Sequence, residues 1–268
     1  MADVQVVGVI RFSVLAEGFG ISLYGGLEEL RDYLFAPESL EFRFHIFENM
    51  CLPTLASQTD EDFHLVLLTS EDLPVDARDR LDQIAGKHPQ ITVFAAGVEK
   101  HHRQVRAAYQ SVPLGKATHR AAFRLDNDDA LCLTYVERLR QLSGGLLQLH
   151  DEDVPTILAF NHGFYVGLNP DGPNDVHDAT EREPLSTGTT LLSQSDLHLN
   201  PYRYNHRALA QHFNLYSDIT TPTFLRTIHA ENEDRVMKKG FERKMPERRV
   251  KRLVREHFGL SLSELQAL

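Results

Sequence analysis

Cysteine is scarce in this sequence, and long apolar runs are absent. The chain of 268 residues contains only Cys51 and Cys132, which lack the spacing of a metal site and lie in apolar surroundings. We expect both to be reduced core residues of a cytoplasmic protein. The longest apolar runs near the N-terminus, VQVVGVI and HLVLLT, are far shorter than the roughly 20 residues of a membrane-spanning helix. The first residues are not basic and precede no long apolar region, so we expect no secretory signal peptide.

Positive charge is also in short supply. The chain has 28 Lys and Arg against 38 Asp and Glu, a formal net charge of −10, which argues against general nucleic-acid binding. The exception is the stretch between Arg235 and Arg255, with ten Lys or Arg and two Glu. This stretch could contact an anionic membrane surface, bind substrate phosphates, or form a solvated helix face on an acidic body.

A dinucleotide-binding glycine motif is missing too. Gly18-Phe19-Gly20 begins the pattern, but Leu23 stands where the third glycine belongs, and the motif starts eight residues after the strand. The sequence therefore gives no support to a nicotinamide or flavin dinucleotide site.

The hydrophobic segments that are present alternate between strand-like and helix-like patterns. Apolar runs predict buried strands, and three- and four-residue periodicity predicts helices between them. The expected strands are Val4–Ile10, Phe63–Thr69, Ile91–Ala96 and Ala121–Leu125, and the expected helices are Leu27–Phe35, Ser39–Cys51 (ended or kinked by Pro53), Leu73–Lys87 and His101–Tyr109. This order predicts an α/β fold with a mostly parallel, Rossmann-like sheet flanked by helices in a single domain.

The C-terminal half is harder to interpret. We expect a helix over Thr134–Leu142 that Gly144-Gly145 ends, a strand over Thr156–Val166 that bends at Gly163, and a lid or binding loop over Leu168–Gly188. Further elements are predicted at His206–Phe213 (helix), Thr223–Ile228 (strand) and Arg248–Phe258 (helix).

The stretch RAAFRLDNDDAL, Arg120–Leu131, is the most informative part of the chain. A short buried strand leads directly into Asp126, Asp128 and Asp129, and carboxylates this dense repel one another unless a cation or hydrogen-bonding ligand lies among them. Hard divalent ions take carboxylate oxygens together with substrate phosphates. At the carboxyl end of a strand in an α/β sheet, a ligand is expected in the adjacent crevice.

Other interpretations of this acidic stretch can be weighed on the same residues. A solvated turn that caps the next helix remains open, because Asp is a favoured N-cap residue. An EF-hand is excluded, since Leu131 stands where the loop requires glycine. A phosphotransferase that uses Asp126 as its nucleophile also stays open. Arg11, at the end of the first strand, could bind phosphate or simply pair with a surface acid.

The segments RFSV, RFHIFENMCLPTLASQTDEDFHLVLLTSEDLP, FRLDNDDAL and LRTIHAEN, in this order, resemble the putative rhamnosyltransferase family of bacteria. The resemblance runs from about Val4 to about Asn232, and it is most specific around Arg124–Leu131. The family belongs to the GT-A-type glycosyltransferases. It therefore implies a GT-A-like domain over 1–234, with a donor half (about 1–135), an acceptor half (about 136–234), and a basic helical segment over 235–268.

The resemblance also implies roles for individual residues. In GT-A enzymes an Asp-x-Asp (DXD) motif holds a divalent cation, Mn²⁺ or Mg²⁺, that bridges the two donor phosphates. Carried onto this chain, Asp126 would contact the ribose or the metal, Asp128 would be a direct ligand, and Asp129 a second ligand or a water-positioning group. His229 would complete the ligand set. Donor binding is assigned to Arg11, Arg103, Arg124, Asp126 and Thr69, of which the arginines would stabilise the leaving diphosphate.

An inverting transfer also needs a general base. His206, Asp196 and Asp218 are the candidates, and the sequence does not choose among them; a retaining transfer would need none.

The expected activity is thus a metal-dependent hexosyltransferase reaction on a nucleotide sugar of dTDP or UDP type. The acceptor is expected to be a saccharide or glycolipid of surface polysaccharide or glycoconjugate synthesis, and the sugar to be rhamnose by the family label. The alternatives are a phosphatase or phosphotransferase and a non-catalytic nucleotide-sugar binder. We expect a cytoplasmic location, with peripheral contact of 235–255 to the membrane as a further prediction.

Overall fold

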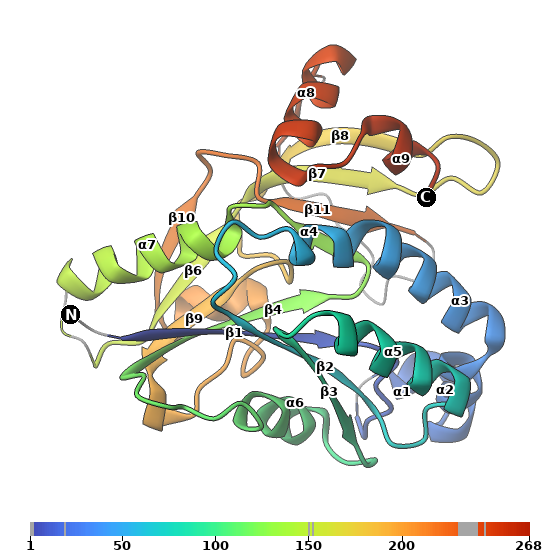
Figure 1. Ribbon diagram of the computed structural model, residues 1–268, viewed down its shortest axis with the longest axis horizontal. Coiled ribbons are helices and arrows are strands. Elements are labelled where there is room, and N and C mark those ends of the chain that lie inside the picture. Colours follow the sequence, from blue (N-terminus) through green and yellow to red (C-terminus); the bar gives the residue numbers. More distant parts are fainter. Residues whose placement is uncertain (1–2, 19, 150, 152, 230–240, 244) are drawn as a thin grey trace.

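The computed structural model describes residues 3–18, 20–149, 151, 153–229, 241–243 and 245–268 (Figure 1). The boundary expected at residue 234 and the motif residues 230–232 lie outside this described part. None of the described helices combines the length and apolar character that crossing a bilayer requires.

The centre of the molecule is a large, mostly parallel sheet, as the sequence predicts. Within the described residues its strand order is β10-β6-β9-β4-β1-β2-β3, and β9 alone runs antiparallel to its neighbours. The strands are β1 (Val4–Arg11), β2 (His64–Ser70), β3 (Ile91–Ala96), β4 (His119–Asp126), β6 (Thr156–Phe160), β9 (Thr190–Gln194) and β10 (Asn214–Asp218). The expected Rossmann-like α/β fold, a mostly parallel sheet flanked by helices, is confirmed.

Helices cover both faces of this sheet. One face packs against α3 (Pro37–Ile46), α4 (Leu52–Ala56), α5 (Val75–Lys87) and α7 (Tyr135–Leu149), and the other packs against α6 (His101–Gln110). Short α1 (Ile21–Tyr24) and α2 (Leu27–Phe35) follow β1 and enclose a small separate cluster around Leu15. This two-sided cover explains why β1, β2 and β4 are nearly continuous apolar runs.

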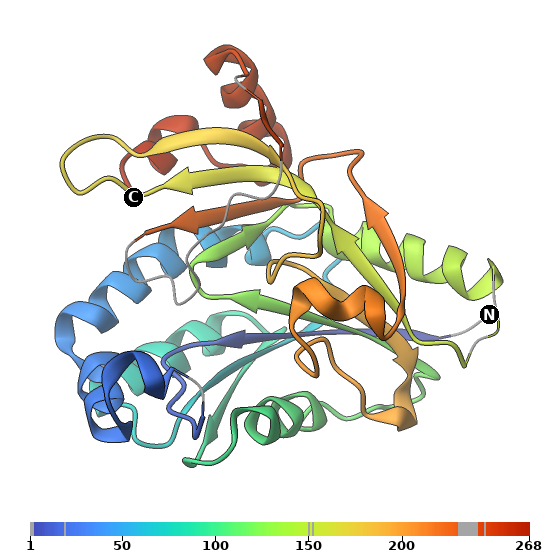
Figure 2. The same cartoon turned by 180° about the vertical axis from the view of Figure 1, so that it is seen from behind.

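A second sheet stands beside the first, and the sequence did not reveal it. Its order is β12-β8-β7-β11-β5, formed by β5 (Asp129–Leu131), β7 (His162–Gly167), β8 (Asp175–Thr180), β11 (Phe224–Ile228) and β12 (Phe241–Arg243). Figures 1 and 2 show it above the large sheet, with α8 (Glu247–Phe258) and α9 (Leu262–Gln266) packed against it. Val250, Val254 and Phe258 of α8 belong to the same hydrophobic core as the large sheet.

Two expectations for the C-terminal half are corrected by this sheet. The segment Thr156–Val166 is not one bent strand, because the chain leaves the large sheet at Asn161 and enters the small sheet at His162. Gly163 serves close packing instead, since a Cβ there would lie 2.3 Å from the backbone oxygen of Phe224. The predicted loop Leu168–Gly188 contains β8, so only parts of it are irregular.

Two expected helix ends are also wrong. The helix begun at Pro37 continues through a π-helical turn, η1 (Phe47–Cys51), into α4, and Pro53 follows this turn without ending the helix. Gly144 and Gly145 lie inside α7, which runs on to Leu149. The residues at His206–Gln211 form a 3₁₀ helix, η3, and Ser195–Leu197 forms another, η2.

Candidate active site

A cavity of about 510 Å³ lies where β1 and β4 end, the edge at which a parallel sheet presents ligand sites. Its walls come from the ends of β1, β4 and β11, from α2, α3 and α6, and from the segment between β9 and η3. Its charged and polar lining comprises Arg11, Ser13, Arg43, His101, Arg124, Asp126, Asn127, Asp128, Asp129, Ser186, Tyr202, Arg203, Tyr204, Asn205, His206, Arg226 and His229.

The three aspartates of the acidic motif share this cavity, but each has a different partner. Asp126, at the end of β4, accepts a hydrogen bond of 2.6 Å from the guanidinium of Arg11, and Asp128 Oδ2 lies 2.9 Å from His229 Nε2. Asp129 begins β5 and accepts a hydrogen bond from the hydroxyl of Thr187. The carboxylates therefore coexist because residues of the chain itself offset their repulsion.

The titration of two of these carboxyls reflects their surroundings. Burial alone would raise the pKa of Asp126, but the positive charges of Arg11 and Arg124 outweigh it and hold that pKa below its ordinary value. Burial and the neighbouring Asp128 charge raise the pKa of Asp129, with Arg226 opposing the rise. Asp126 thus stays a carboxylate.

Arg226 is a site residue that sequence reasoning missed. It lies opposite Asp129 in the antiparallel pairing of β11 with β5, is 8% exposed, and donates a hydrogen bond of 3.1 Å to Ser186 Oγ. The charges of all three motif aspartates raise its pKa, Asp129 most among them, although burial works in the opposite direction. Alternation along the predicted strand Thr223–Ile228 could have placed Arg226 on one face, but only the second sheet shows what that face meets.

Packing against Tyr202 orients two arginines of the cavity wall, Arg11 and Arg124. The Arg124 guanidinium lies 4.2 Å from the ring centroid of Tyr202, and that of Arg11 lies 5.5 Å from the same ring. Such cation–π contacts hold guanidinium groups without consuming all of their donors. Both arginines are thereby oriented towards the cavity before any ligand is present.

Several buried polar atoms of the cavity wall lack a hydrogen-bond partner among the described residues. They are Ser13 Oγ, Arg124 Nε, Asn127 Nδ2 and His206 Nε2. Ser13 also has a left-handed backbone with φ of 49°, which is uncommon for a residue other than glycine and is typical of functional sites. Buried polar groups are normally satisfied, so this concentration indicates a site made for a polar ligand.

Two histidines in the wall are held neutral. Burial, together with the charges of Arg124, Arg226 and Arg207, lowers the pKa of His206 to about 3. Burial and the charges of Arg11 and Arg124 lower the pKa of His101 to about 3 as well. His206 is therefore an uncharged imidazole at neutral pH.

Four of the expected site residues do not reach the cavity. Arg103 is exposed on α6, Thr69 is fully buried in β2, and Asp196 is exposed on η2. Asp218 is bound to Arg138 at 2.5 Å and accepts two hydrogen bonds from Thr220. Their positions give no support to the roles expected for them, and for Asp218 they indicate a structural one.

The residues expected to hold a metal ion form a pair rather than a set of four. Within the part of the chain that the structure describes, no three His, Cys, Asp or Glu side chains are close enough to share an ion. Asp126 is engaged by Arg11 and Asp129 by Thr187, which leaves Asp128 and His229. The Asp128 carboxylate oxygen and the His229 imidazole nitrogen lie 2.9 Å apart, and both are atom types that bind divalent cations. The pair would therefore fit a divalent cation that takes its remaining ligands from other groups.

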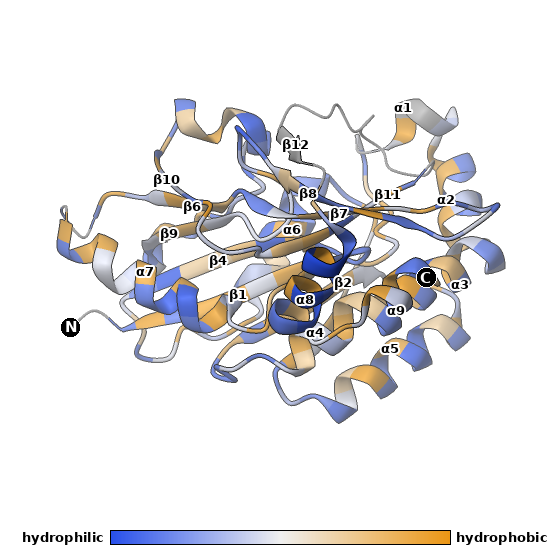
Figure 3. Cartoon of the chain, turned by 90° about the horizontal axis from the view of Figure 1, so that it is seen from above, coloured by the Kyte–Doolittle hydropathy of each residue, from blue (hydrophilic) through white to orange (hydrophobic). Residues whose placement is uncertain are grey.

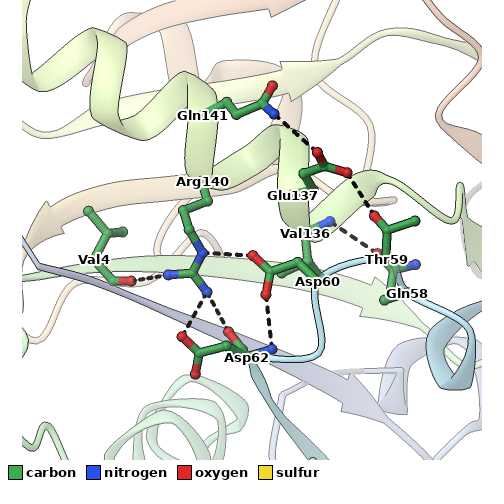
Figure 4. Close-up of polar contacts among 9 residues, drawn as sticks. All are labelled: Val4, Gln58, Thr59, Asp60, Asp62, Val136, Glu137, Arg140 and Gln141. Atoms are coloured by element: carbon green, nitrogen blue, oxygen red, sulfur yellow. Dashed lines mark hydrogen bonds and ion pairs between the residues drawn. The ribbon is translucent and has the colours of Figure 1, made fainter.

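The QTDEDF segment binds the helix that follows the acidic motif, and Figure 4 shows these contacts. Gln58 donates to the Cys132 carbonyl and accepts from the Val136 amide, and Thr59 donates to Glu137. Asp60 and Asp62 are bridged by Arg140 of α7, which also donates to the Val4 carbonyl; the individual bonds include Arg140–Asp60 at 2.8 Å and Arg140–Asp62 at 3.2 Å. These acids therefore tie α7, through Arg140, to the start of β1, and they do not line the cavity.

Several solved structures are similar to the chain, but only at a distance. The crystal structure of S. aureus TarS has a TM-score of 0.43 and 10% identity over 84% of this chain and 37% of TarS. The crystal structure of S. aureus TarS 1–349 in complex with UDP has a TM-score of 0.41 and 11% identity, and the match covers 84% of this chain and 60% of the TarS chain. A "Putative Glucose-1-Phosphate Thymidylyltransferase from Bacillus anthracis" has a TM-score of 0.38 and 9% identity. This match covers 82% of this chain and 89% of the other. The chain thus spans less than two thirds of either TarS chain, and likeness at this level does not establish a shared function.

Family membership rests on the sequence itself. Curated proteins gave no significant match. A family model described as "Putative rhamnosyl transferase" matches residues 5–240, nearly the whole chain, and confirms the resemblance carried by RFSV, FRLDNDDAL and their neighbouring segments. The chain therefore belongs to this rhamnosyl transferase family, a family of glycosyltransferases.

Proposed function

We propose that the protein transfers a sugar from a nucleoside-diphosphate donor to an acceptor hydroxyl. The family description favours rhamnose as the sugar, and with it a donor of dTDP or UDP type. The observation that carries this proposal is the cavity itself, in which three oriented arginines (Arg11, Arg124 and Arg226) face an acidic motif at the ends of β1 and β4. A diphosphate and a polyhydroxylated sugar are ligands that such a wall can satisfy.

The arginines would act on the leaving group. Negative charge develops on the nucleoside diphosphate as the glycosidic bond breaks, and guanidinium groups that are already oriented stabilise it without reorganisation. Arg124 Nε has no hydrogen-bond partner among the described residues, and Arg11 is fixed by Asp126. Asp126 remains ionised, so in this proposal its second oxygen accepts a hydrogen bond from a donor hydroxyl such as that of the ribose.

Asp128 and His229 would hold the divalent cation. When bound, a Mn²⁺ or Mg²⁺ ion would neutralise charge on the donor phosphates. Phe42 packs its ring edge-on against His229, with centroids 5.1 Å apart and the planes at 73°, which sets the orientation of the imidazole. Asp129 and Arg226, behind this pair, keep the end of β4 in place through β5 and β11.

His206 is the general base that we propose for an inverting transfer. Among the three candidates it alone lines the cavity, its imidazole is neutral, and its Nε2 has no partner in the described residues. A neutral ring can accept the acceptor's proton, and the negative charge of a bound diphosphate would offset the arginines that now weaken it as a base. The acceptor, a saccharide or glycolipid, would enter on the side of Ser186 and the segment before η3.

A panel of donors tests the proposal. The protein is incubated with UDP-, dTDP- and GDP-sugars in the presence of Mn²⁺, Mg²⁺ or a chelator, and release of the nucleoside diphosphate is followed together with p-nitrophenyl phosphate hydrolysis. We expect divalent-ion-stimulated release from one nucleotide class and no phosphate-ester hydrolysis. Hydrolysis of phosphate esters would support instead the Asp126 phosphotransferase reaction, and tight nucleotide binding with no release from any donor would support a binding protein.

A further inference from the structure

Helix α8 carries a strongly basic exposed face that the glycosyl-transfer site does not use. Its buried side is Val250, Val254 and Phe258, which are 3%, 0% and 1% exposed. Its exposed cations are Arg248, Arg249, Lys251, Arg252 and Arg255. In Figure 3 this helix shows a markedly hydrophilic side above the small sheet. Residues 235–240 and 244 of the basic stretch lie outside the described part of the chain.

Four of these cations form a single stripe. Arg248, Lys251, Arg252 and Arg255 follow i, i+3, i+4, i+7 spacing, which places them along one side of the helix. Within the described residues none of the five cations pairs with a carboxylate, whereas Arg31, Arg78, Arg80, Arg138 and Arg140 elsewhere on the surface all do. The acidic side chains of α8 itself, Glu247 and Glu256, are exposed and make no ion pair with the stripe. Among the described residues, the positive face is thus not neutralised by ion pairs.

Local helix stability does not explain this arrangement. Arg248 and Arg249 lie in the first turn, where a cation opposes the helix dipole. Arg248 with Arg252, and Lys251 with Arg255, are like charges at i, i+4, which disfavour the helix. Arg255 favours the helix, since it lies in the last turn and donates a hydrogen bond to the Gly259 carbonyl. Arg248, Lys251 and Arg252 do not gain this stabilisation.

The base of the helix is rigidly attached next to the acidic motif. The amide of Leu133, two residues beyond β5, donates a hydrogen bond of 2.7 Å to the carbonyl of His257. Gly259 caps α8 in the left-handed conformation with φ of 71°, directly against Leu133. Whatever holds the basic face therefore fixes the orientation of the site as well.

We propose that the basic face of α8 docks the protein onto an anionic lipid membrane. Figures 1 and 2 place α8 at the margin of the molecule, above the small sheet. A flat anionic surface could contact this stripe while most of the acidic body stays beyond the Debye length, about 8–10 Å at physiological salt. A long flexible polyanion such as nucleic acid would meet the net charge of −10 of the remaining surface. Juxtaposed Lys and Arg are the residues by which peripheral proteins recognise acidic lipids.

Vesicle binding by the full chain tests this proposal without any measurement of activity. The wild type is sedimented with phosphatidylcholine vesicles containing no or about 30% phosphatidylglycerol, at about 0.1 M and about 0.5 M salt. The test variant replaces Arg248, Lys251, Arg252 and Arg255 with Gln. The control variant replaces Lys87, Lys100, Arg106 and Lys116, which are exposed elsewhere, and so removes the same charge.

We expect the wild type and the control to bind only the anionic vesicles and to be released at high salt. The test variant should lose affinity on the order of 100-fold with an unchanged melting temperature. Equal loss in both variants, equal binding to neutral vesicles, or no binding by the wild type would overturn the proposal. Salt-sensitive binding of this face to polyglutamate or DNA, with none to vesicles, would assign another class of partner and overturn it as well.

Discussion

Arg226 lies directly opposite Asp129 in the pairing of β11 with β5, and the two residues are 8% and 3% exposed. Opposite residues on antiparallel strands have Cβ atoms about 4.5–5.5 Å apart. The acidic motif, which on its sequence alone calls for an external cation, thus has a cation of its own in the next strand. The acidic motif therefore does not depend on a divalent ion at Asp128 and His229 to offset its charge, although such an ion would offset it further.

Replacement of Arg226 with Gln should therefore destabilise the protein by about 3–5 kcal/mol, because it leaves a buried carboxyl without its counter-charge. The measurement is urea unfolding at pH 7. The control is the double variant Arg226→Gln/Asp129→Asn, which we expect to recover part of the loss, since the uncompensated charge is gone. Additive losses in the double variant would contradict the pairing.

Loss of Asp128 should remove the response to metal. We expect Asp128→Ala to lower divalent-ion-stimulated donor turnover by at least about 100-fold with little change in melting temperature. Asp79→Ala, at an exposed position of α5, is the matched control and should behave as the wild type. Full metal stimulation in Asp128→Ala would rule out Asp128 as a ligand.

Substitutions of Arg124 and Arg103 should have clearly different effects on the reaction, although the sequence predicts that both residues bind the sugar donor. Arg124 lines the cavity over Tyr202, whereas Arg103 points to solvent from α6. Arg124→Gln should raise the donor KM or lower kcat, with kcat/KM falling by about 10–100-fold, and Arg103→Gln should leave both unchanged. The measurement is the initial rate over a range of donor concentrations. A large effect of Arg103→Gln with none of Arg124→Gln would show that the donor binds at another surface.

Asp218 should contribute to the stability of the folded protein at neutral pH, and not to catalysis. Burial raises its pKa, but hydrogen bonds from Thr220 and Arg138 prevail and place it below the ordinary value. A lowered folded pKa stabilises the protein above the unfolded value, about 3.9, and this stability is lost as the pH falls through the folded pKa. Asp218→Asn should therefore cost about 1–3 kcal/mol at pH 7 and progressively less below pH 4.

Chemical unfolding from pH 7 down to pH 3, together with kcat at pH 7, checks this prediction. A large fall in kcat of the folded Asp218→Asn variant would restore Asp218 as a candidate base. The corresponding change at His206, His206→Gln, is expected to lower kcat by about 100-fold at little cost in stability.

Two glycines of the C-terminal half should respond to replacement by alanine with changes in stability of opposite sign. A Cβ at Gly163 would meet the Phe224 carbonyl at 2.3 Å, so Gly163→Ala should cost about 3 kcal/mol by forcing β7 and β11 apart. At Gly144, inside α7, nothing lies within 4 Å, and Gly144→Ala should stabilise the protein by about 0.5–1 kcal/mol. Thermal unfolding of the two variants distinguishes these outcomes, and destabilisation by Gly144→Ala would contradict the continuous α7.

The sequence predicted the N-terminal half well because its structural signals are local. Strands buried on both faces give apolar runs, and the helices between them repeat their apolar residues at three- and four-residue steps, so β1, β2, β3 and β4 could be placed within a residue or two. The position of the acidic motif at the end of β4 followed from the same pattern. The approach of His229 to Asp128 was anticipated only through the family resemblance.

The remainder depended on contacts distant in sequence. Arg226 lies opposite Asp129, about a hundred positions earlier, and Tyr202 lies under Arg124, nearly eighty positions earlier. Nothing in the sequence near Arg226 or Tyr202 indicates either contact. A pair of glycines usually ends a helix, yet packing of Leu146 and Leu147 carries α7 past them. The apolar run Thr156–Val166 shows strand character throughout, and only the partner strands reveal that it serves two sheets.

The crossing at Asn161 limits how the protein can open. Asn161 is 1% exposed, and its amide and carbonyl are bonded to Asp218 and Glu181 respectively, so one residue joins the two sheets with no slack. A hinge between β6 and β7 has no length of chain here to bend. We therefore expect the large and the small sheet to move as one block at this crossing.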